Sequence, residues 1–205
     1  MKGFSVFITG AVLLIIAGVV GSFIGDKAHL LFYLTEYRST PADYFFYYVT
    51  LLGEPHGFIF FGLLLWFISW KRMLTVPVTG IIVTIVSFLL KQVFQSERPI
   101  LYLDKMGWDG PMSVLDYHIV TGHTSFPSGH SMAGWALFTL MAAHIRKPWF
   151  SILCLFLATA VSISRIYLVV HFLRDVVVGA MVGIALGYGV YYYYKQLDKE
   201  KIKMA

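Results

Sequence analysis

Long apolar runs separated by short polar or charged stretches make up most of this chain. Most of these runs approach the ~20 residues that an α-helix needs to cross the hydrocarbon core of a bilayer. The pattern therefore predicts six transmembrane helices, at about residues 4–24, 56–70, 75–94, 131–145, 149–170 and 175–194. We expect an all-α integral membrane bundle that forms one membrane-embedded domain over residues 1–205.

The segment between the first and second predicted spans, residues 25–55, mixes polar positions with many aromatic ones. Amphipathic rings settle at the boundary between lipid and water. We therefore predict an interfacial helical segment here, and its role, either anchoring the chain or gathering substrate, stays open. The longest polar stretch, residues 95–130, separates the third span from the fourth.

Composition supports a membrane protein. Of the 205 residues, 58% are hydrophobic and 13% are charged, and the mean hydropathy is +0.73, whereas a soluble domain carries roughly a quarter charged residues. So few charges cannot cover a water-facing surface, which excludes a soluble domain. The net charge of +5 includes no long basic run, so we expect no nucleic-acid partner. The single cysteine, Cys154, excludes an internal disulfide framework and is expected to be a buried apolar residue.

The number of cations differs between the two sides of the predicted topology. Six crossings place both termini on one side with nine Lys and Arg residues, against seven on the other side, three of which belong to the charged groups described next. The excess over the remaining four predicts cytoplasmic termini, because cytoplasmic loops are enriched in Lys and Arg. Residues 95–130 then face outward.

Two cations lie at the end of the third predicted span, where charge is costly. A cation in mid-bilayer costs ~2.5–3.5 kcal/mol and is usually functional or paired. Lys91 and Arg98 are two helical turns apart, so we expect them on one face about 10 Å apart. Pro99 disfavours helical geometry at Arg98, so the helix should stop there and direct the guanidinium into the outer loop. Taken alone, Lys91 also fits a lysine that snorkels to the interface.

A second group precedes the fourth span, where residues 126–130 read Phe-Pro-Ser-Gly-His. Gly129 lets the backbone approach a ligand, and the first turn of a helix offers unpaired N–H groups that bind phosphate. His130 follows Gly129 and lies at the same helix start. By itself this group also fits a plain turn and helix start.

A third group consists of Ser164-Arg165, then His171, then Asp175. His171 and Asp175 are four residues apart, the spacing at which a carboxylate can hold an imidazole on one helical face. Such a contact selects one tautomer and leaves the other ring nitrogen free to attack or to accept a proton. All three groups lie at the outer ends of the predicted spans.

The three cations and the helix N–H groups suit a phosphoryl group, whose oxygens carry the negative charge. Arg165 is expected to clamp the phosphate through two hydrogen bonds, while Lys91 and Arg98 neutralise the remaining charge. Carboxylates are scarce around the site, so a magnesium cage is not expected. We predict a metal-independent reaction without a cofactor.

The two histidines and the aspartate complete the chemistry. His171 is expected to be the nucleophile that forms a phosphohistidine, with Asp175 orienting it. His130 is expected to protonate the departing oxygen and then to activate the water that releases phosphate.

Together, the three groups resemble the three-part signature of the type 2 phosphatidic acid phosphatase (PAP2) superfamily. The resemblance covers about residues 56–194, with all parts complete and in order. Its parts are Lys91 followed by Arg98-Pro99, then Pro127-Ser128-Gly129-His130, then Ser164-Arg165 with His171 and Asp175. The small size and six-span plan are similar to bacterial lipid phosphatases of this superfamily, including phosphatidylglycerophosphate phosphatase B and undecaprenyl pyrophosphate phosphatases.

The resemblance implies an integral membrane phosphatase that removes the terminal phosphate of a lipid phosphate such as phosphatidylglycerophosphate. Undecaprenyl pyrophosphate and phosphatidic acid are the alternative substrates, because the signature does not fix the loop at residues 100–126. The implied location is a bacterial cell membrane with the site facing outward. The implied catalytic residues are His130, His171 and Asp175, and the implied phosphate-binding residues are Lys91, Arg98, Ser128, Gly129 and Arg165.

Other functions stay open at this point. The same cations would serve a small anion transporter or channel, although no predicted span is interrupted at mid-membrane as transporter sites usually are. A haem protein needs paired histidines inside spans, and here they lie at span ends. Vanadium haloperoxidases share the signature but are soluble. No motif indicates an obligate protein partner.

Overall fold

The computed structural model describes residues 2–108 and 122–204 of the chain. Every regular element in that part of the chain is a helix, as expected of a backbone that must satisfy its own hydrogen bonds within lipid. In chain order the elements are α1 (Lys2–Gly21), α2 (His29–Glu36), α3 (Thr40–Thr50), the 3-10 turn η1 (Leu51–Gly53), α4 (Pro55–Ile68), α5 (Trp70–Met73), α6 (Thr75–Phe94), α7 (Pro99–Lys105), α8 (Gly129–Ile145), α9 (Pro148–Tyr167) and α10 (Leu173–Met204).

All six predicted spans correspond to helices, but some of these helices are short. Among residues 2–108 and 122–204, four stretches have the length and apolar composition of a membrane span, and there are five if one bent pair of helices counts as a single span. The four are Lys2–Gly21, Trp70–Lys105, Pro148–Tyr167 and Leu173–Lys199, and the pair is Thr40–Gly53 with Pro55–Ile68, bent by 64°. α8 has 17 residues, fewer than the ~20 of a full crossing. The all-helical bundle is confirmed, and the number of six crossings stays a prediction.

α8 and α10 lie against each other so closely that their backbones touch. Gly179, Gly183 and Gly187 fall on one face of α10. A methyl group added at these glycines would lie only 2.3–2.6 Å from backbone oxygens of α8, those of Ser128, Met132 and Ala136 respectively. Small residues at this spacing allow helices to approach to backbone contact. The contact fixes the start of α10 relative to the start of α8.

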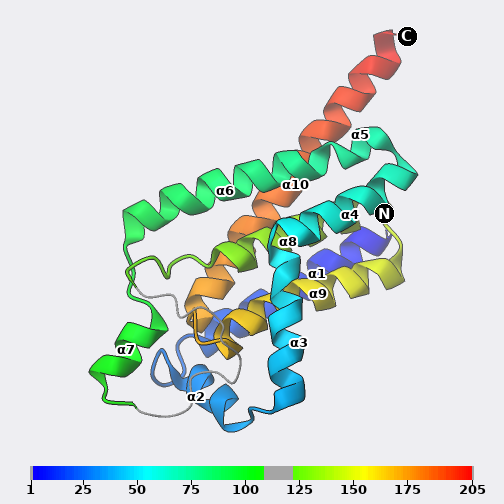
Figure 1. Cartoon of the computed structure of the whole chain (residues 1–205). Helices are drawn as coiled ribbons and strands as arrows, with labels where there is room; N and C mark the ends of the chain where they lie inside the picture. The colour runs from blue at the N-terminus through cyan, green and yellow to red at the C-terminus, as the bar shows by residue number, and fades with distance from the viewer. Residues whose placement is uncertain (1, 109–121, 205) are drawn as a thin grey trace.

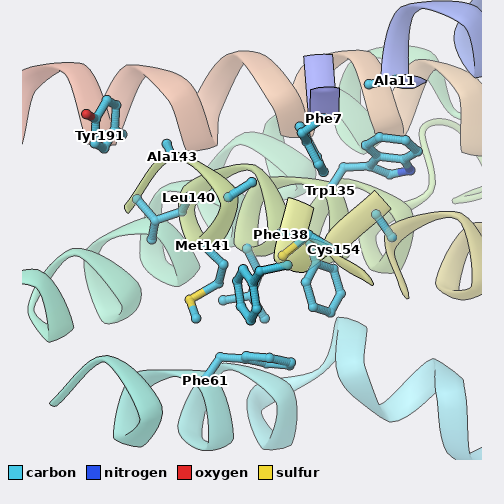
Figure 2. Packing of buried hydrophobic residues seen from close by; sticks show 14 of the residues in the cluster. Phe7, Ala11, Phe61, Trp135, Phe138, Leu140, Met141, Ala143, Cys154 and Tyr191 are labelled. Atoms are coloured by element: carbon cyan, nitrogen blue, oxygen red, sulfur yellow. The ribbon is translucent and has the colours of Figure 1, made fainter. Parts of the chain in front are cut away.

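The apolar core surrounds α8, which is buried along nearly its whole length. Figure 2 shows the aromatic side chains involved: Phe7 lies edge-on to Trp135 with ring centroids 6.0 Å apart, and Phe61 to Phe138 at 5.1 Å. Cys154 is buried in the same cluster, as the sequence predicted. Because lipid tails are as apolar as these side chains, close packing rather than removal from water holds such helices together.

The two ends of the bundle carry different segments. In Figure 1 the N-terminus, α5 and the turn between α8 and α9 lie toward one end, and α2 and α7 lie toward the other. The three charged groups sit at the end of α6, at the start of α8 and around the junction of α9 with α10. The fold gathers all three at the end where α2 and α7 lie (Figure 1). Which side of a membrane this end faces stays a prediction.

Residues 25–55 form α2, α3 and η1, so the predicted helical segment is confirmed. Its place at a membrane interface stays a prediction, and in the structure α3 packs against α9. Asp43 of α3 is 2% exposed and accepts a 2.7 Å hydrogen bond from the hydroxyl of Tyr167, and Thr50 is fully buried. Tyr44 and Tyr48 on the same helix remain exposed. One face of α3 therefore belongs to the bundle.

Candidate active site

His171 lies in the turn that joins α9 to α10. The backbone N–H groups of Val170 and His171 donate to the carbonyl oxygen of Arg165 at 3.1 and 3.2 Å, and Val169 is left-handed with φ +58°. These hydrogen bonds fold the turn back onto the end of α9 and leave His171 only 2% exposed. The turn therefore fixes the imidazole beside Arg165.

Asp175, in the first turn of α10, faces the same imidazole. Its Oδ2 lies 3.7 Å from Nδ1 of His171 and accepts the backbone N–H of Phe172 at 3.0 Å. α10 begins at Leu173, so the prediction that His171 and Asp175 share one helical face is wrong, and the turn brings them together instead. The Ser125 hydroxyl donates to the same carboxylate oxygen at 2.5 Å and lies 3.5 Å from Nδ1. No motif in the sequence singles out this serine.

The surroundings of His171 keep its imidazole neutral. Burial lowers the pKa of His171 to about 3; Arg165 and Arg98 also lower this pKa, while Asp175 opposes the shift. Because Nδ1 faces the carboxylate, Nδ1 carries the hydrogen and Nε2 keeps its lone pair. A neutral imidazole with a free nitrogen is the form that attacks phosphorus.

Arg98 is buried, which corrects the expectation that it points into the outer loop. α6 ends at Phe94, and Gln95 is left-handed with φ 40°, so Lys91 and Arg98 do not share one helix. Arg98 stands in extended backbone just before α7. Its guanidinium donates to the carbonyl oxygen of Val170 at 3.1 Å and to that of Thr124 at 3.2 Å. The side chain therefore reaches the turn that carries His171.

The start of α8 meets the start of α10 at the same place. The Ser128 hydroxyl caps α8 by accepting the N–H of Ser131 at 3.4 Å, and the N–H of Ser128 donates to the carbonyl oxygen of Asp175 at 2.9 Å. Nζ of Lys91 is 3.7 Å from the point that a Cβ on Gly129 would occupy. The first turn of a helix offers unpaired N–H groups and the positive end of the helix dipole. A cation and a helix N-terminus thus face one location.

Two further polar residues support the site from outside the predicted groups. Nε2 of His130, which is partly buried, lies 3.0 Å from Oε1 of Glu54. Arg165 is 2% exposed, and its Nη1 donates to the hydroxyl of Thr50 at 2.5 Å. Glu54 could have been noticed in the sequence, because it is an acidic residue beside an apolar run. A single threonine such as Thr50 carries no such signal.

The eight residues that the sequence selected belong to one connected cluster. The turn joins Arg165 to His171, and Asp175 contacts both His171 and Ser128. The remaining members connect through their neighbours: Arg98 through Val170, Lys91 through Gly129, and His130 through the start of α8. These contacts bring three cations, two imidazoles and a helix N-terminus to one end of the bundle.

A cavity of about 440 Å³ lies between α4 and α6 and begins beside this cluster. Glu54 and Gly53 line it next to His130, and apolar side chains from both helices, including Phe58, Ile59 and Ile81, form the rest of the wall. Ile59 and Ile81 are more than half exposed. The cavity therefore extends from Glu54, which contacts His130, to the apolar surface of the bundle.

The family described as the PAP2 superfamily matches residues 72–199 of this chain. That range contains the eight predicted site residues, and Glu54 and Thr50 lie outside it.

Individual proteins of known sequence or structure are also similar. Glucose-6-phosphatase 3 of Mus musculus is 28% identical over 162 residues, which cover 69% of this chain and 45% of the relative. This chain thus spans less than half the length of that relative. A crystal structure of LpxE from Aquifex aeolicus superposes with a TM-score of 0.67 at 24% identity, covering 80% of this chain and 93% of the other. A second crystal structure is that of the first transmembrane PAP2 type phosphatidylglycerolphosphate phosphatase from Bacillus subtilis. It superposes with a TM-score of 0.63 at 21% identity, covering 98% of both chains. At these identities the two structures show a shared fold.

Proposed function

The chain belongs to the PAP2 superfamily, and from this premise we propose that it is an integral membrane phosphatase that removes a terminal phosphate from a lipid phosphate. One observation carries the proposal. The buried, neutral imidazole of His171 lies in a cluster with three cations and the N-terminus of α8. This arrangement suits nucleophilic attack on a phosphorus atom whose oxygens are held by positive charge.

The proposed reaction has two steps. In the first, Nε2 of His171 attacks phosphorus, the bond from phosphorus to the ester oxygen breaks, and His130 gives that oxygen a proton. In the second, His130 takes a proton from water as the water attacks the phosphohistidine and releases phosphate. Arg165, Arg98 and Lys91 hold the phosphoryl oxygens throughout.

A metal ion has no part in this proposal. Within residues 2–108 and 122–204, no group of three or more His, Cys, Asp and Glu side chains that could hold a metal ion comes together. The charge on the phosphoryl oxygens is met by side-chain cations and backbone N–H groups.

A lipid substrate is favoured by the cavity between α4 and α6. Its apolar walls begin next to His130 and continue to the exposed surface of the bundle, so an acyl or isoprenyl chain would lie there while its phosphate meets the cations. We propose phosphatidylglycerophosphate as the substrate, which agrees with the activity named for the Bacillus subtilis protein. Undecaprenyl pyrophosphate and phosphatidic acid are the alternatives.

A substrate panel tests both the class and the choice of substrate. Detergent-purified protein is incubated, with EDTA present, with phosphatidylglycerophosphate, phosphatidic acid, undecaprenyl pyrophosphate or glucose 6-phosphate, and phosphate release is measured. We expect release from the lipids and the highest kcat/KM for phosphatidylglycerophosphate. Preferred hydrolysis of glucose 6-phosphate would overturn the lipid assignment, and activity only after addition of Mg²⁺ would overturn the metal-free mechanism.

A further inference from the structure

Glu54 stands beside His130 although it belongs to none of the three charged groups. Its Oε1 lies 3.0 Å from Nε2 of His130, and its other oxygen lies 3.7 Å from Nδ1 of the exposed His56. Both side chains of the Glu54–His130 pair are about 30% exposed or less. The pair therefore lies at the mouth of the site, where the alcohol part of a substrate would leave.

The local backbone places Glu54 beside His130. Gly53 packs directly on His130, and a Cβ at Gly53 would lie 2.8 Å from the carbonyl oxygen of His130. Glu54 is the residue that precedes the first turn of α4, yet its side chain makes no capping hydrogen bond to that helix. The short carboxylate of an aspartate at this position would accept from the free N–H groups there. Here the carboxylate faces the imidazole instead.

The charges around His130 explain how the contact with Glu54 would affect the protonation of the imidazole. Arg165 from α9 and Lys91 from α6 both face the imidazole, and Glu54 at the start of α4 supplies the opposing negative charge. His56 is the other titratable group that contacts Glu54. Two nearby cations disfavour an imidazolium, whereas an anion in hydrogen-bond contact favours it. A general acid has to carry its proton when the substrate arrives.

Building on the proposed function, we infer that Glu54 is the positioning residue of the general acid His130, holding Nε2 and stabilising the imidazolium so that Nδ1 delivers the proton. In the first step the Nδ1–H bond breaks as the ester oxygen gains a hydrogen, while phosphorus exchanges that oxygen for Nε2 of His171. In the second step Nδ1 takes a proton from water as the water oxygen bonds to phosphorus and the bond to His171 breaks. Glu54 keeps its negative charge throughout. The site then contains two carboxylate–imidazole pairs, Asp175 with the nucleophile and Glu54 with the acid.

The dependence on the leaving group separates this role from a merely structural one. A lipid alcohol is a poor leaving group and needs the proton, whereas 4-nitrophenolate departs without one. Single-turnover release of the alcohol or of nitrophenol reports the first step alone. For Glu54→Gln we expect this rate to fall about 10- to 100-fold with the lipid phosphate that the wild type hydrolyses fastest, and by less than about 3-fold with 4-nitrophenyl phosphate.

Two variants and a pH profile complete the test. Glu54→Asp keeps the charge and should recover part of the rate with the same lipid phosphate. Glu36→Gln makes the same chemical change at an exposed position at the end of α2 and should have no effect on either substrate. In Glu54→Gln the loss of rate at alkaline pH should begin at lower pH than in the wild type, because the imidazolium has lost its stabilising charge.

The outcomes distinguish the two proposals. If the wild-type protein hydrolyses neither 4-nitrophenyl phosphate nor any lipid of the substrate panel, the phosphatase assignment fails and the role of Glu54 fails with it. If the wild type is active but Glu54→Gln leaves both rates unchanged, or lowers both equally, the role of Glu54 alone is overturned. Thermal unfolding of each variant in detergent shows whether an equal loss comes from a damaged fold.

Discussion

His171 meets two requirements of a nucleophile through its position in the chain. The turn between α9 and α10 buries the imidazole and places Nδ1 near Asp175, so that Nε2 is free. The same turn accepts a hydrogen bond from Arg98 through the carbonyl oxygen of Val170. A cation that binds phosphate is thereby attached to the loop that carries the attacking atom. Their relative position is set by the backbone, which limits the motion needed to reach the reactive geometry.

Removing the His171 imidazole tests its role directly. We expect His171→Ala to lower the turnover of lipid phosphate by about 10⁴-fold or more, because no other side chain takes over the bond to phosphorus. Wild-type protein quenched in alkali during turnover of ³²P-labelled substrate should carry label on His171, because phosphohistidine is stable in base, and the variant should carry none. The variant should unfold within a few degrees of the wild type in detergent. Substantial remaining turnover would exclude His171 as the nucleophile.

The protonation state of His171 is a second prediction at this scale. Because burial lowers its pKa to about 3, the imidazole should stay neutral from pH 8 down to about pH 4.5, and only stronger acid should protonate it. The spectrum of ¹⁵N-histidine-labelled protein should include an imidazole whose resonances do not titrate over this range and which carries its hydrogen on Nδ1. The spectrum of His171→Gln, which lacks these resonances, assigns them. Titration near pH 6.5 would contradict the neutral, buried state.

At the scale of elements, α8 and α10 determine whether the groups of the site meet. The hydrogen bond from Ser128 to the carbonyl oxygen of Asp175 exists only because the two helices touch along the glycine face of α10. α3 and η1 add support from the other side, where Thr50 holds Arg165 and Glu54 faces His130. The signature residues therefore depend on two contacts between elements far apart in the chain.

A single methyl group on α10 tests the first contact. In Gly183→Ala the new Cβ would lie 2.3 Å from the carbonyl oxygen of Met132, so the helices must separate, at a cost of about 1–3 kcal/mol typical of overpacking. We expect a lower unfolding temperature in detergent and reduced phosphatase activity. Gly189→Ala is the matched control on the same helix, since nothing lies within 4 Å of its added Cβ. That variant should be as stable as the wild type or slightly more so. Equal unfolding temperatures for the two variants would show that close helix contact is not required.

For the whole molecule, the sequence predicted the helices because an apolar backbone in lipid has few other ways to satisfy its hydrogen bonds. It also predicted the site residues that carry charge, since charges are rare in this chain and each needs an explanation. Ser125 and Thr50 were missed because their hydroxyls resemble many others, and only the folded chain shows what they hold. The position of Arg98 was mispredicted because α6 ends at a left-handed Gln95, which the pattern of apolar residues does not indicate.

The orientation in the membrane is the prediction that concerns the molecule as a whole. The counts of cations predict that the termini and the turn between α8 and α9 lie in the cytoplasm and that the candidate active site lies outside. Single-cysteine labelling suits this protein because its own cysteine, Cys154, is 1% exposed and should give little background. His123→Cys places a thiol at an exposed position near the site, and Lys147→Cys places one at an exposed position in the turn before α9.

A membrane-impermeant maleimide applied to intact cells should label His123→Cys and should leave Lys147→Cys unlabelled until the cells are permeabilised. This result follows if the two ends of the bundle lie on opposite sides of the bilayer, with the site reaching lipid phosphates of the outer leaflet. The reverse labelling would place the site in the cytoplasm, and its substrates would then come from the inner leaflet. Labelling of both variants in intact cells would mean that the bundle does not separate these two ends across a membrane.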